Sequence, residues 1–240
     1  MENTENDLPR GTLFVVSTPI GNLKDITIRA LEVLSKVDLI AAEDTRHTRI
    51  LLQRYCIKTP TTSYYDFNKE KKIPTLLEKL ESGAKIAVVS DAGTPGISDP
   101  AFRLVRACID RHIPIQTLPG ATAFVPALIL SGLPTDRFAF EGFLPRKKGR
   151  KKRIEALEEE TRTLIFYESS HRLAKTLADL EPIYAGRRAA LVREITKKYE
   201  EVQRGTLGEI QARLPQLKLK GEFVLIVEGK GKQKGRGESA

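Results

Sequence analysis

Short runs of β-branched and apolar residues alternate with amphipathic helical stretches through the first half of this 240-residue chain. Strands are expected at 12–17, 37–42, 85–90 and 115–118, with helices at 27–36, 46–55, 68–81 and 101–111. Neighbouring parallel strands need a long crossover, usually a helix, whereas antiparallel strands can be joined by short turns. The order therefore predicts an α/β fold whose sheet is mainly parallel and carries helices on both faces.

The second half continues this pattern. Helices are expected at 121–130, from the basic segment to about residue 160 and at 171–180, and strands at 137–141, 163–167, 189–195 and 223–227. The Pro and Gly residues of 119–132 mark a domain boundary, because such residues concentrate in linkers. We predict a disordered N-terminus over 1–11, α/β domains over 12–120 and 121–229, and a basic disordered tail over 230–240.

The loop from Asp91 to Pro100 follows a predicted strand and contains two glycines and two prolines. Ligands of open parallel sheets bind beyond the carboxyl ends of the strands, and glycine lets a ligand approach the main chain. Asp91–Ile97 is therefore predicted to face a ligand. Asp99 followed by Pro100 is typical of a helix start, with the aspartate as N-cap and the proline in the first turn.

Two other loops follow predicted strands. The loop at Pro19 and Ile20 has a single glycine, Gly21, so it lacks the dinucleotide fingerprint G-x-G-x-x-G, and the chain also lacks the P-loop pattern. Small residues dominate Pro119–Ala123. They leave room for a flat ring such as adenine, but they equally suit close packing of a helix on a strand.

Positive charge is concentrated in two tracts, although the net charge of the whole chain is only +9. Residues 146–153 carry seven cations and no carboxylate, and residues 230–240 carry a further excess, so the rest of the chain is close to neutral. Such tracts suit polyanions, because phosphates neutralised by Lys and Arg release condensed counterions. The alternative is a solvated loop and tail without a specific partner.

The two cysteines, Cys56 and Cys108, have no neighbouring Cys or His, so neither a disulfide framework nor a metal site is expected. We interpret them as buried or incidental thiols of a reducing compartment. No apolar stretch approaches the ~20 residues that span a bilayer, and the first residues do not resemble a secretory leader. We therefore expect a cytoplasmic protein with no membrane contact and no metal.

Several motifs, taken together, resemble those of the tetrapyrrole-methylase superfamily. They are Pro19–Thr27, Ala42–Arg46 and the Asp91–Pro100 loop; Phe166–Arg172 and Arg193–Lys197 further resemble its ribosomal RNA branch, the small-subunit (16S) cytidine 2′-O-methyltransferases. The resemblance runs from Thr12 to Glu228 in the expected order. It departs from the family pattern at two helix starts, where Ala101 replaces the usual glycine and Ser170 the usual proline.

The resemblance implies a class III methyltransferase: two α/β domains with S-adenosylmethionine in the cleft between them, working as a homodimer. Its implied substrate is a cytidine ribose in the decoding-centre region of 16S ribosomal RNA, in the small ribosomal subunit. Carried over by position, the cofactor-binding residues are Pro19, Ile20, Asp91, Gly93, Thr94, Ile97, Thr122 and Ala123, together with Tyr167, Glu222 and Phe223 from the second domain.

Methyl transfer from a sulfonium is an in-line displacement that depends on alignment and needs no metal. A ribose 2′-hydroxyl is a poor nucleophile, so a base or a cation beside the developing alkoxide would help. Glu43, Asp44 and Arg46 crowd opposite charges at a strand end and are the predicted catalytic group. An N-cap with a salt bridge is the alternative interpretation of these residues. Further candidates are Glu168, His171, Arg193, Glu194 and Lys197, and no single base is assigned.

RNA is expected to be held by phosphate contacts from the first tract: Arg146, Lys147, Lys148, Arg150, Lys151, Lys152 and Arg153. Two rival interpretations stay open. A tetrapyrrole methyltransferase would share the fold and cofactor, but a small macrocycle gives no reason for seven cations in one run. A non-catalytic RNA-binding assembly factor would explain the charge but not the glycine loop.

Overall fold

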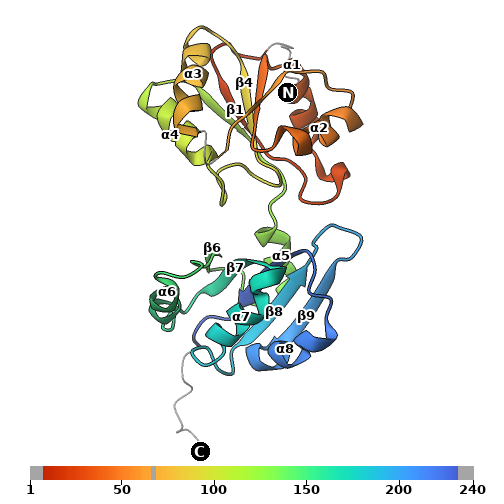
Figure 1. Ribbon diagram of the computed structural model, residues 1–240, viewed down its shortest axis with the longest axis vertical. Helices are drawn as coiled ribbons and strands as arrows, with labels where there is room; N and C mark the ends of the chain where they lie inside the picture. Colours follow the sequence, from red (N-terminus) through yellow and green to blue (C-terminus); the bar gives the residue numbers. More distant parts are fainter. Residues whose placement is uncertain (1–7, 66–68, 232–240) are drawn as a thin grey trace, which may run out of the picture. The chain divides into compact units, whose positions relative to one another are not determined.

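The chain forms two compact units, Met1–Thr122 and Ala123–Ala240, which are called the first and second unit below (Figure 1). The computed structural model describes residues 8–65 and 69–231. Most of the predicted basic tail and the first seven residues of the predicted N-terminal segment therefore lie outside the described residues. Each unit contains one five-stranded sheet with helices, which confirms the predicted class of two α/β domains. The boundary predicted from the sequence lies after residue 120.

The first unit has a parallel sheet. Its elements are β1 (Leu13–Val16), a 3-10 turn (Leu23–Asp25), α1 (Ile28–Lys36), β2 (Leu39–Ala42), α2 (Thr45–Arg54), β3 (Thr61–Ser63), α3 (Lys69–Glu81), β4 (Ile86–Val89), α4 (Ala101–Asp110) and β5 (Ile115–Leu118). The strand order is β3-β2-β4-β1-β5, and every neighbouring pair is parallel. The predicted parallel sheet is therefore confirmed.

Helices cover both faces of this first sheet. Leu13 and Val15 of β1 pack in a core with α3 and α4, whereas Phe14 and Val16 pack in a second core with α1 and α2. A strand covered on both faces can be apolar at every position, and all four residues of β1 are buried. The uninterrupted apolar run in the sequence is explained by this double covering.

The second unit has a mixed sheet. Its elements are α5 (Phe124–Ser131), β6 (Phe138–Phe143), α6 (Arg150–Ala156), β7 (Thr163–Ser169), α7 (Ser170–Leu180), β8 (Arg188–Arg193), β9 (Glu201–Thr206), α8 (Leu207–Arg213), a 3-10 turn (Leu214–Gln216) and β10 (Glu222–Val227). The strand order is β6-β7-β10-β8-β9. Only the β6–β7 pair is parallel, and the other three pairs are antiparallel.

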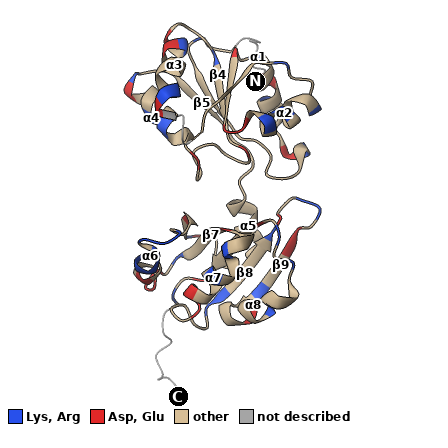
Figure 2. Ribbon diagram, in the orientation of Figure 1, with Lys and Arg blue, Asp and Glu red and all other residues tan. Residues whose placement is uncertain are grey.

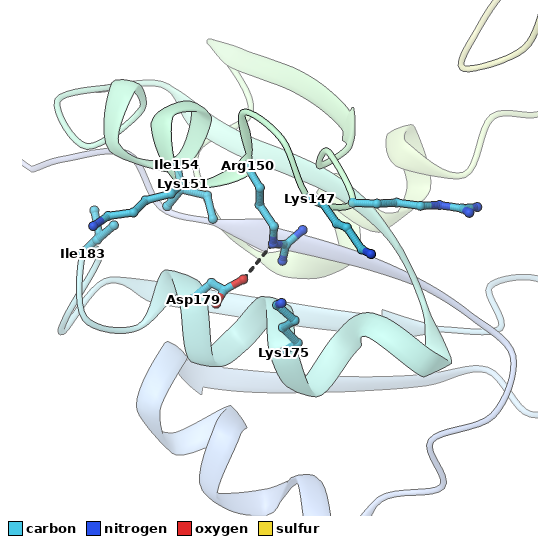
Figure 3. A pocket seen from close by; sticks show the side chains of 8 residues that line it. Lys147, Arg150, Lys151, Ile154, Lys175, Asp179 and Ile183 are labelled. Atoms are coloured by element: carbon cyan, nitrogen blue, oxygen red, sulfur yellow. Dashed lines mark hydrogen bonds and ion pairs between the residues drawn. The ribbon is translucent and has the colours of Figure 1, made fainter.

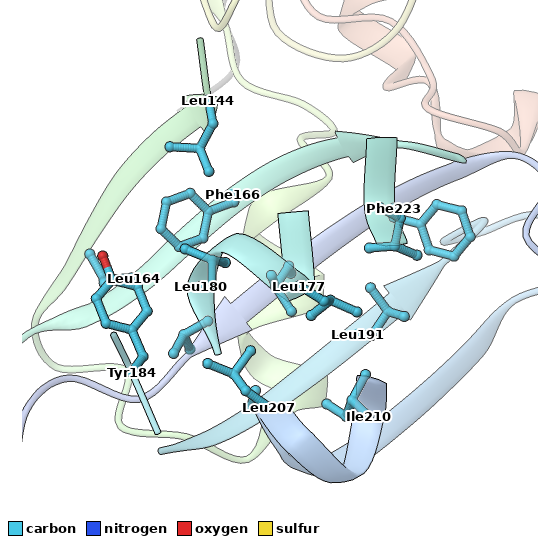
Figure 4. Close-up of a cluster of buried hydrophobic side chains, with 14 of the residues drawn as sticks. Leu144, Leu164, Phe166, Leu177, Leu180, Tyr184, Leu191, Leu207, Ile210 and Phe223 are labelled. Atoms are coloured by element: carbon cyan, nitrogen blue, oxygen red, sulfur yellow. The ribbon is translucent and has the colours of Figure 1, made fainter. Parts of the chain in front are cut away.

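The two faces of the second sheet are covered by different helices. Helices α6, α7 and α8 share one core with the strands, which includes Phe166, Leu177 and Leu191 (Figure 4). Side chains alternate along a strand, so Tyr167 points to the opposite face. There its ring packs against Phe140, whose ring lies 4.9 Å from that of Phe124 at the start of α5. Helix α5 therefore covers the second face.

Some elements differ from the sequence-based expectation. Strands β3 and β9 and helix α8 are not predicted; β3 has three residues, and β9 is a polar edge strand without clear alternation. The basic helix expected to reach about residue 160 is wrong in length, because α6 ends at Ala156 and single turns follow. The helix expected from residue 121 begins instead at Phe124.

The structure also bears on the cysteines and the apolar segments. Cys108 of α4 is buried and Cys56 is exposed, and both thiols are free. Burial raises the pKa of Cys108 to about 11, so its thiol stays protonated and inert near neutral pH.

Within residues 8–65 and 69–231, no helix combines the length and hydropathy needed to span a bilayer.

Candidate functional site

Three loops meet at the carboxyl edge of the first sheet, where β4, β1 and β5 are neighbours. The loops after β1 and β4 are joined by an antiparallel bridge between Thr18 and Gly93. The N–H of Thr18 donates to the Gly93 carbonyl oxygen (2.9 Å), and the N–H of Gly93 donates to that of Thr18 (3.0 Å). The main chain alone therefore holds the glycine loop against the segment that leads into Pro19 and Ile20.

Two short hydroxyl side chains connect the third loop, which follows β5. The Ser17 hydroxyl donates to the carbonyl oxygen of Leu118 (3.0 Å) and lies 2.9 Å from the Thr94 hydroxyl. Thr94 in turn donates to the carbonyl oxygen of Ala121 (3.0 Å), next to Thr122. Gly93 and Thr94 of the predicted cofactor set thus belong to a hydrogen-bond network that joins the three loops on which the other first-unit residues of the set lie.

Two glycines allow the loops to approach so closely. Gly93 has a φ of +85°, and a Cβ there would lie 3.2 Å from Cγ2 of Ile20 and 4.0 Å from Cα of Thr122. A Cβ at Gly120 would lie only 2.6 Å from the Cβ of Ser17. The lack of a Cβ at these two glycines therefore sets the shape of this edge. The main chain at Gly120 is exposed, so a ligand can approach it.

The end of the glycine loop leads into α4, as predicted, but Asp99 and Pro100 occupy different positions at the helix start from those expected. The Asp99 carboxylate accepts from the N–H of Ala101 (2.8 Å) and from the N–H of Gly96 (2.9 Å). Pro100 immediately precedes the helix instead of being its first residue. Asp99 therefore closes the loop and caps the helix, while Ile97 is 37% exposed.

The predicted catalytic residues lie next to the glycine loop, because β2 and β4 are neighbours. The N–H of Asp44 donates to Oδ1 of Asp91 (2.9 Å), and the N–H of Asp91 donates to Oε2 of Glu43 (3.3 Å). Asp91 thus links two motifs that are 47 residues apart in the sequence. Its carboxylate is engaged by the main chain of Asp44, which gives it a role in shaping the edge.

Asp44 has the contacts of a helix cap and an ion pair. It is the N-cap of α2, accepting from the N–H of Arg46 (2.8 Å), and its Oδ2 lies 2.6 Å from the Arg46 guanidinium. The hydrogen bonds from Arg46 hold the pKa of Asp44 well below its usual range. A carboxylate held ionised in this way is a weak proton acceptor, which disfavours Asp44 as a general base.

The second-unit residues of the predicted cofactor set divide between two faces of their sheet. Burial raises the pKa of Tyr167, against the opposing effect of backbone N–H groups of Phe124 and Ala123, so its hydroxyl lies at the start of α5. The strand register puts Glu222 on the same face as Tyr167. Phe223 points to the other face and is buried in the core (Figure 4).

The Arg193–Lys197 motif forms a turn of unusual conformation after β8. Glu194 and Thr196 have φ values of +49° and +64°, a region that few non-glycine residues adopt. The Lys197 ammonium donates to Glu194 (2.9 Å) and to Glu222 (2.8 Å). Burial would raise the pKa of Glu194, but the Lys197 hydrogen bond and other contacts outweigh it and lower the pKa.

The seven cations of the first basic tract, which lies on α6 and the loop before it, have different surroundings (Figure 2). Arg150 is buried, and Arg153 pairs with Glu141 at 2.5 Å. Lys151 lies 3.7 Å from Glu155 at the surface. The exposed members are Arg146, Lys147, Lys148, Lys151, Lys152 and Arg153. The tract therefore combines structural ion pairs with cations available to a partner.

Arg150 and Glu168 belong to one buried network. The Arg150 guanidinium donates to Asp179 (2.7 Å) and to the Thr176 hydroxyl (2.7 Å), and Thr176 donates to Glu168 (2.5 Å). Glu168 also accepts from the N–H of Ser169 (2.8 Å). Glu168, a candidate in the sequence, is thus fully engaged in holding α7 against β7 and α6.

The predicted site did not include Ser17 of the loop network, Gly120 beside it, or Lys175 of α7, which faces the basic tract. Ser17 ends a predicted strand and Gly120 lies in the loop of small residues after another, and these positions give a usable signal. Lys175 carries no such signal, because only the packing of α7 against α6 brings it near the tract.

Within the described parts of the chain, no three His, Cys, Asp or Glu side chains are placed to hold a metal ion.

Two α/β units, the first with a glycine loop at the carboxyl edge of a parallel sheet, define a class of α/β proteins in which that edge is the usual place for a ligand. The family model for Tetrapyrrole (Corrin/Porphyrin) Methylases matches residues 12–211. The chain belongs to this family, which confirms the resemblance seen in the motifs.

Relatives and solved structures agree with this membership. The chain is 52% identical to "Ribosomal RNA small subunit methyltransferase I" of Haemophilus influenzae, covering 92% of this chain and 80% of the relative. It is 45% identical to the protein of that name from Thermotoga maritima, covering 92% and 99%. The structure of uroporphyrin-III C-methyltransferase from Thermus thermophilus, complexed with S-adenyl homocysteine, is similar with a TM-score of 0.64, 17% identity and coverage of 90% and 97%. At that identity the likeness concerns the fold.

Proposed function

We propose that this chain transfers a methyl group from S-adenosylmethionine to the 2′-hydroxyl of a cytidine ribose in 16S ribosomal RNA, in the decoding-centre region. One observation carries the proposal: a relative that is 52% identical over 92% of the chain is named as a methyltransferase of the small-subunit ribosomal RNA. The choice of cytidine and of the 2′-oxygen rests on the motifs Phe166–Arg172 and Arg193–Lys197.

The carboxyl edge of the first unit fits such a cofactor. The glycine loop and the loop after β5 offer exposed main chain, short hydroxyl side chains and no cation, which suits a ligand that itself carries positive charge. When bound, S-adenosylmethionine supplies an electrophilic methyl group on a sulfonium. The proposed holders in the first unit are Pro19, Ile20, Gly93, Thr94, Ile97 and Thr122, with Asp91 shaping the edge. The other four, Ala123, Tyr167, Glu222 and Phe223, rest on the family resemblance.

Glu43, Asp44 and Arg46 are proposed to act on the acceptor hydroxyl in different roles. Glu43 takes the proton, since Asp44 is held ionised by Arg46 and is a weak base. The Arg46 side chain is 88% exposed and can stand beside a developing alkoxide. Asp44 is a positioning residue, because its carboxylate fixes the Arg46 guanidinium.

The proposed partner is 16S ribosomal RNA in the small ribosomal subunit, held through the exposed cations of residues 146–153. Arg150 and Arg153 act within the unit, on Asp179 and Glu141. As the resemblance implies, the enzyme would work as a homodimer, which sedimentation at micromolar concentration can check. A cytoplasmic location is also part of the proposal, consistent with two free thiols.

The test is transfer of labelled methyl groups from S-adenosylmethionine to small subunits isolated from a strain that lacks this modification. The expected result is one labelled cytidine, methylated on its 2′-oxygen and mapped by primer extension. Label on a base would overturn the 2′-O assignment. Label on a uroporphyrinogen acceptor but not on RNA would favour a tetrapyrrole substrate, and RNA binding without cofactor binding would favour an assembly factor.

The same assay separates the roles of the acidic residues. Glu43→Gln should lower kcat by roughly 100-fold with little change in cofactor affinity, because general bases typically contribute that much. Asp44→Asn should have a smaller effect on kcat. Equal activity of Glu43→Gln and the wild type would remove Glu43 from the reaction.

A further inference from the structure

A basic pocket of about 500 Å³ lies between α6 and α7 of the second unit (Figure 3). Its lining comes from the loop before α6, from α6 itself, from α7 and from the turn after it. The lining residues are Arg146, Lys147, Arg150, Lys151, Ile154, Lys175, Asp179 and Ile183. Five cations and one carboxylate therefore surround one cavity.

Arg150 forms the fixed part of this pocket. Its side chain is 7% exposed, and its guanidinium donates to Asp179 (2.7 Å), to the Thr176 hydroxyl (2.7 Å) and to the carbonyl oxygen of Pro145 (3.3 Å). These bonds neutralise Asp179 and tie the loop before α6 to α7. Arg150 is thus committed to the protein, and the single carboxylate of the pocket is already paired.

Lys151 lies 3.7 Å from Glu155, so Arg146, Lys147 and Lys175 are the cations of the pocket for which no ion pair is present among the described residues. Of these three, Lys147 and Lys175 lie beside the Arg150 guanidinium (Figure 3). Both side chains are exposed, and they extend from the loop and from α7 into the space around the Arg150 guanidinium (Figure 3). Among the described residues, no carboxylate lies within 4.0 Å of either ammonium group. Two uncompensated cations in one pocket repel each other, and an anion bound between them would relieve that repulsion.

We propose that this pocket binds one backbone phosphate of the RNA substrate, with Lys147 and Lys175 as its donors and Arg150 as the residue that positions them. This inference rests on the proposed function, because it assumes an RNA partner. The inference goes further than a general basic surface in two respects. It includes Lys175, which lies outside the basic tract, and it assigns a single phosphate to the pocket. The half-buried Ile183 borders the pocket and offers an apolar surface beside the cations.

The test compares two double variants with the same change of charge. Lys147→Gln/Lys175→Gln removes both donors of the pocket, whereas Lys148→Gln/Lys152→Gln removes two exposed lysines of the tract that do not line it. The probe is an unmodified 16S ribosomal RNA fragment, with affinity measured at several salt concentrations. The pocket variant should lose roughly ten-fold in affinity, and its salt slope should fall by about 0.7–1, as expected for one lost phosphate contact.

The control variant should lose affinity only about two-fold, because its lysines make dispersed contacts. Each pocket lysine replaced singly should account for most of the loss, since both hold the same phosphate. Equal losses in the two double variants would overturn the pocket. A loss seen with whole subunits but not with bare RNA would assign the pocket to a protein carboxylate and also overturn it. A wild-type chain that binds RNA but transfers no methyl group would instead contradict the proposed function.

Discussion

The two surfaces proposed to bind ligands, one on each unit, have opposite chemistry. The edge of the first unit consists of main chain, glycines and the hydroxyls of Ser17 and Thr94. Because its loops pack closely at the glycines, a single added methyl group there would change its shape. The pocket of the second unit is lined by lysine and arginine side chains around the buried guanidinium of Arg150. The difference indicates that the first surface is sensitive to added atoms, whereas the second is sensitive to charge and salt.

The largest effect is expected from removal of Arg150. Arg150→Met leaves the half-buried Asp179 and the buried Thr176 without the guanidinium, and loss of these charge-assisted hydrogen bonds should lower the free energy of unfolding by about 2–4 kcal/mol. The chain has no tryptophan, so urea unfolding is best followed by circular dichroism. If two transitions appear, only that of the second unit should shift.

The matched control is Lys152→Met on the exposed side of the same helix, which should change stability by no more than about 0.5 kcal/mol. A similar loss in both variants would mean that the charge of α6, and not the buried network, stabilises the second unit. That result would break the distinction between structural and available cations in the tract.

An added methyl group should disturb the first unit at Gly120. Gly120→Ala places a Cβ 2.6 Å from that of Ser17, and overpacking of this kind costs about 1–3 kcal/mol. If the cost falls on the cofactor-bound state, the Kd for S-adenosylmethionine rises roughly ten- to hundred-fold, measurable by calorimetry.

Gly208→Ala in α8 provides the comparison, because a Cβ there meets Glu181 at an ordinary 3.5 Å. Its cofactor affinity should equal that of the wild type. Unchanged affinity in Gly120→Ala would show that the edge tolerates volume, and that the contrast between the units is smaller than their chemistry indicates.

The smallest effect concerns pH and the turn at Glu194. The pKa of Glu194 is lowered in the folded chain, so its contribution is present above the unfolded pKa and is lost as pH falls through the folded value. The pKa of Lys197 is raised, so its contribution is lost only as pH rises beyond about 10.5. Lys197→Met should cost about 1 kcal/mol at pH 7 and flatten the stability profile below pH 4.5. An unchanged acid limb would contradict this account.

The architecture follows from the sequence wherever the apolar pattern is strong. β1 and β4 are apolar throughout, and Thr27 caps α1 through the N–H of Ala30, so these elements are predictable. The polar edge strand β9 is not, since pairing along one side stabilises it without an apolar pattern. The capping box of Thr206 and Glu209 is a signal from which α8 was predictable.

The candidate site was predictable in its parts but not in its connections. The sequence indicates the glycine loop and the acidic group separately, and only the sheet order brings Asp91 beside Asp44. Likewise, the seven cations of residues 146–153 give no hint that Arg150 is buried while Lys147 is exposed. That distinction depends on Asp179 and Thr176, which lie more than 25 residues away in the sequence.

The bridge between Thr18 and Gly93 has a consequence for local opening. Both amides lie in loops, yet each is bonded as in a strand pair, so their hydrogens should exchange with solvent as slowly as those of β1 and β4. The glycine loop, held by this bridge, is expected to open only when the sheet itself opens. Its protection against exchange would then report the global stability of the first unit, whether or not a ligand is present.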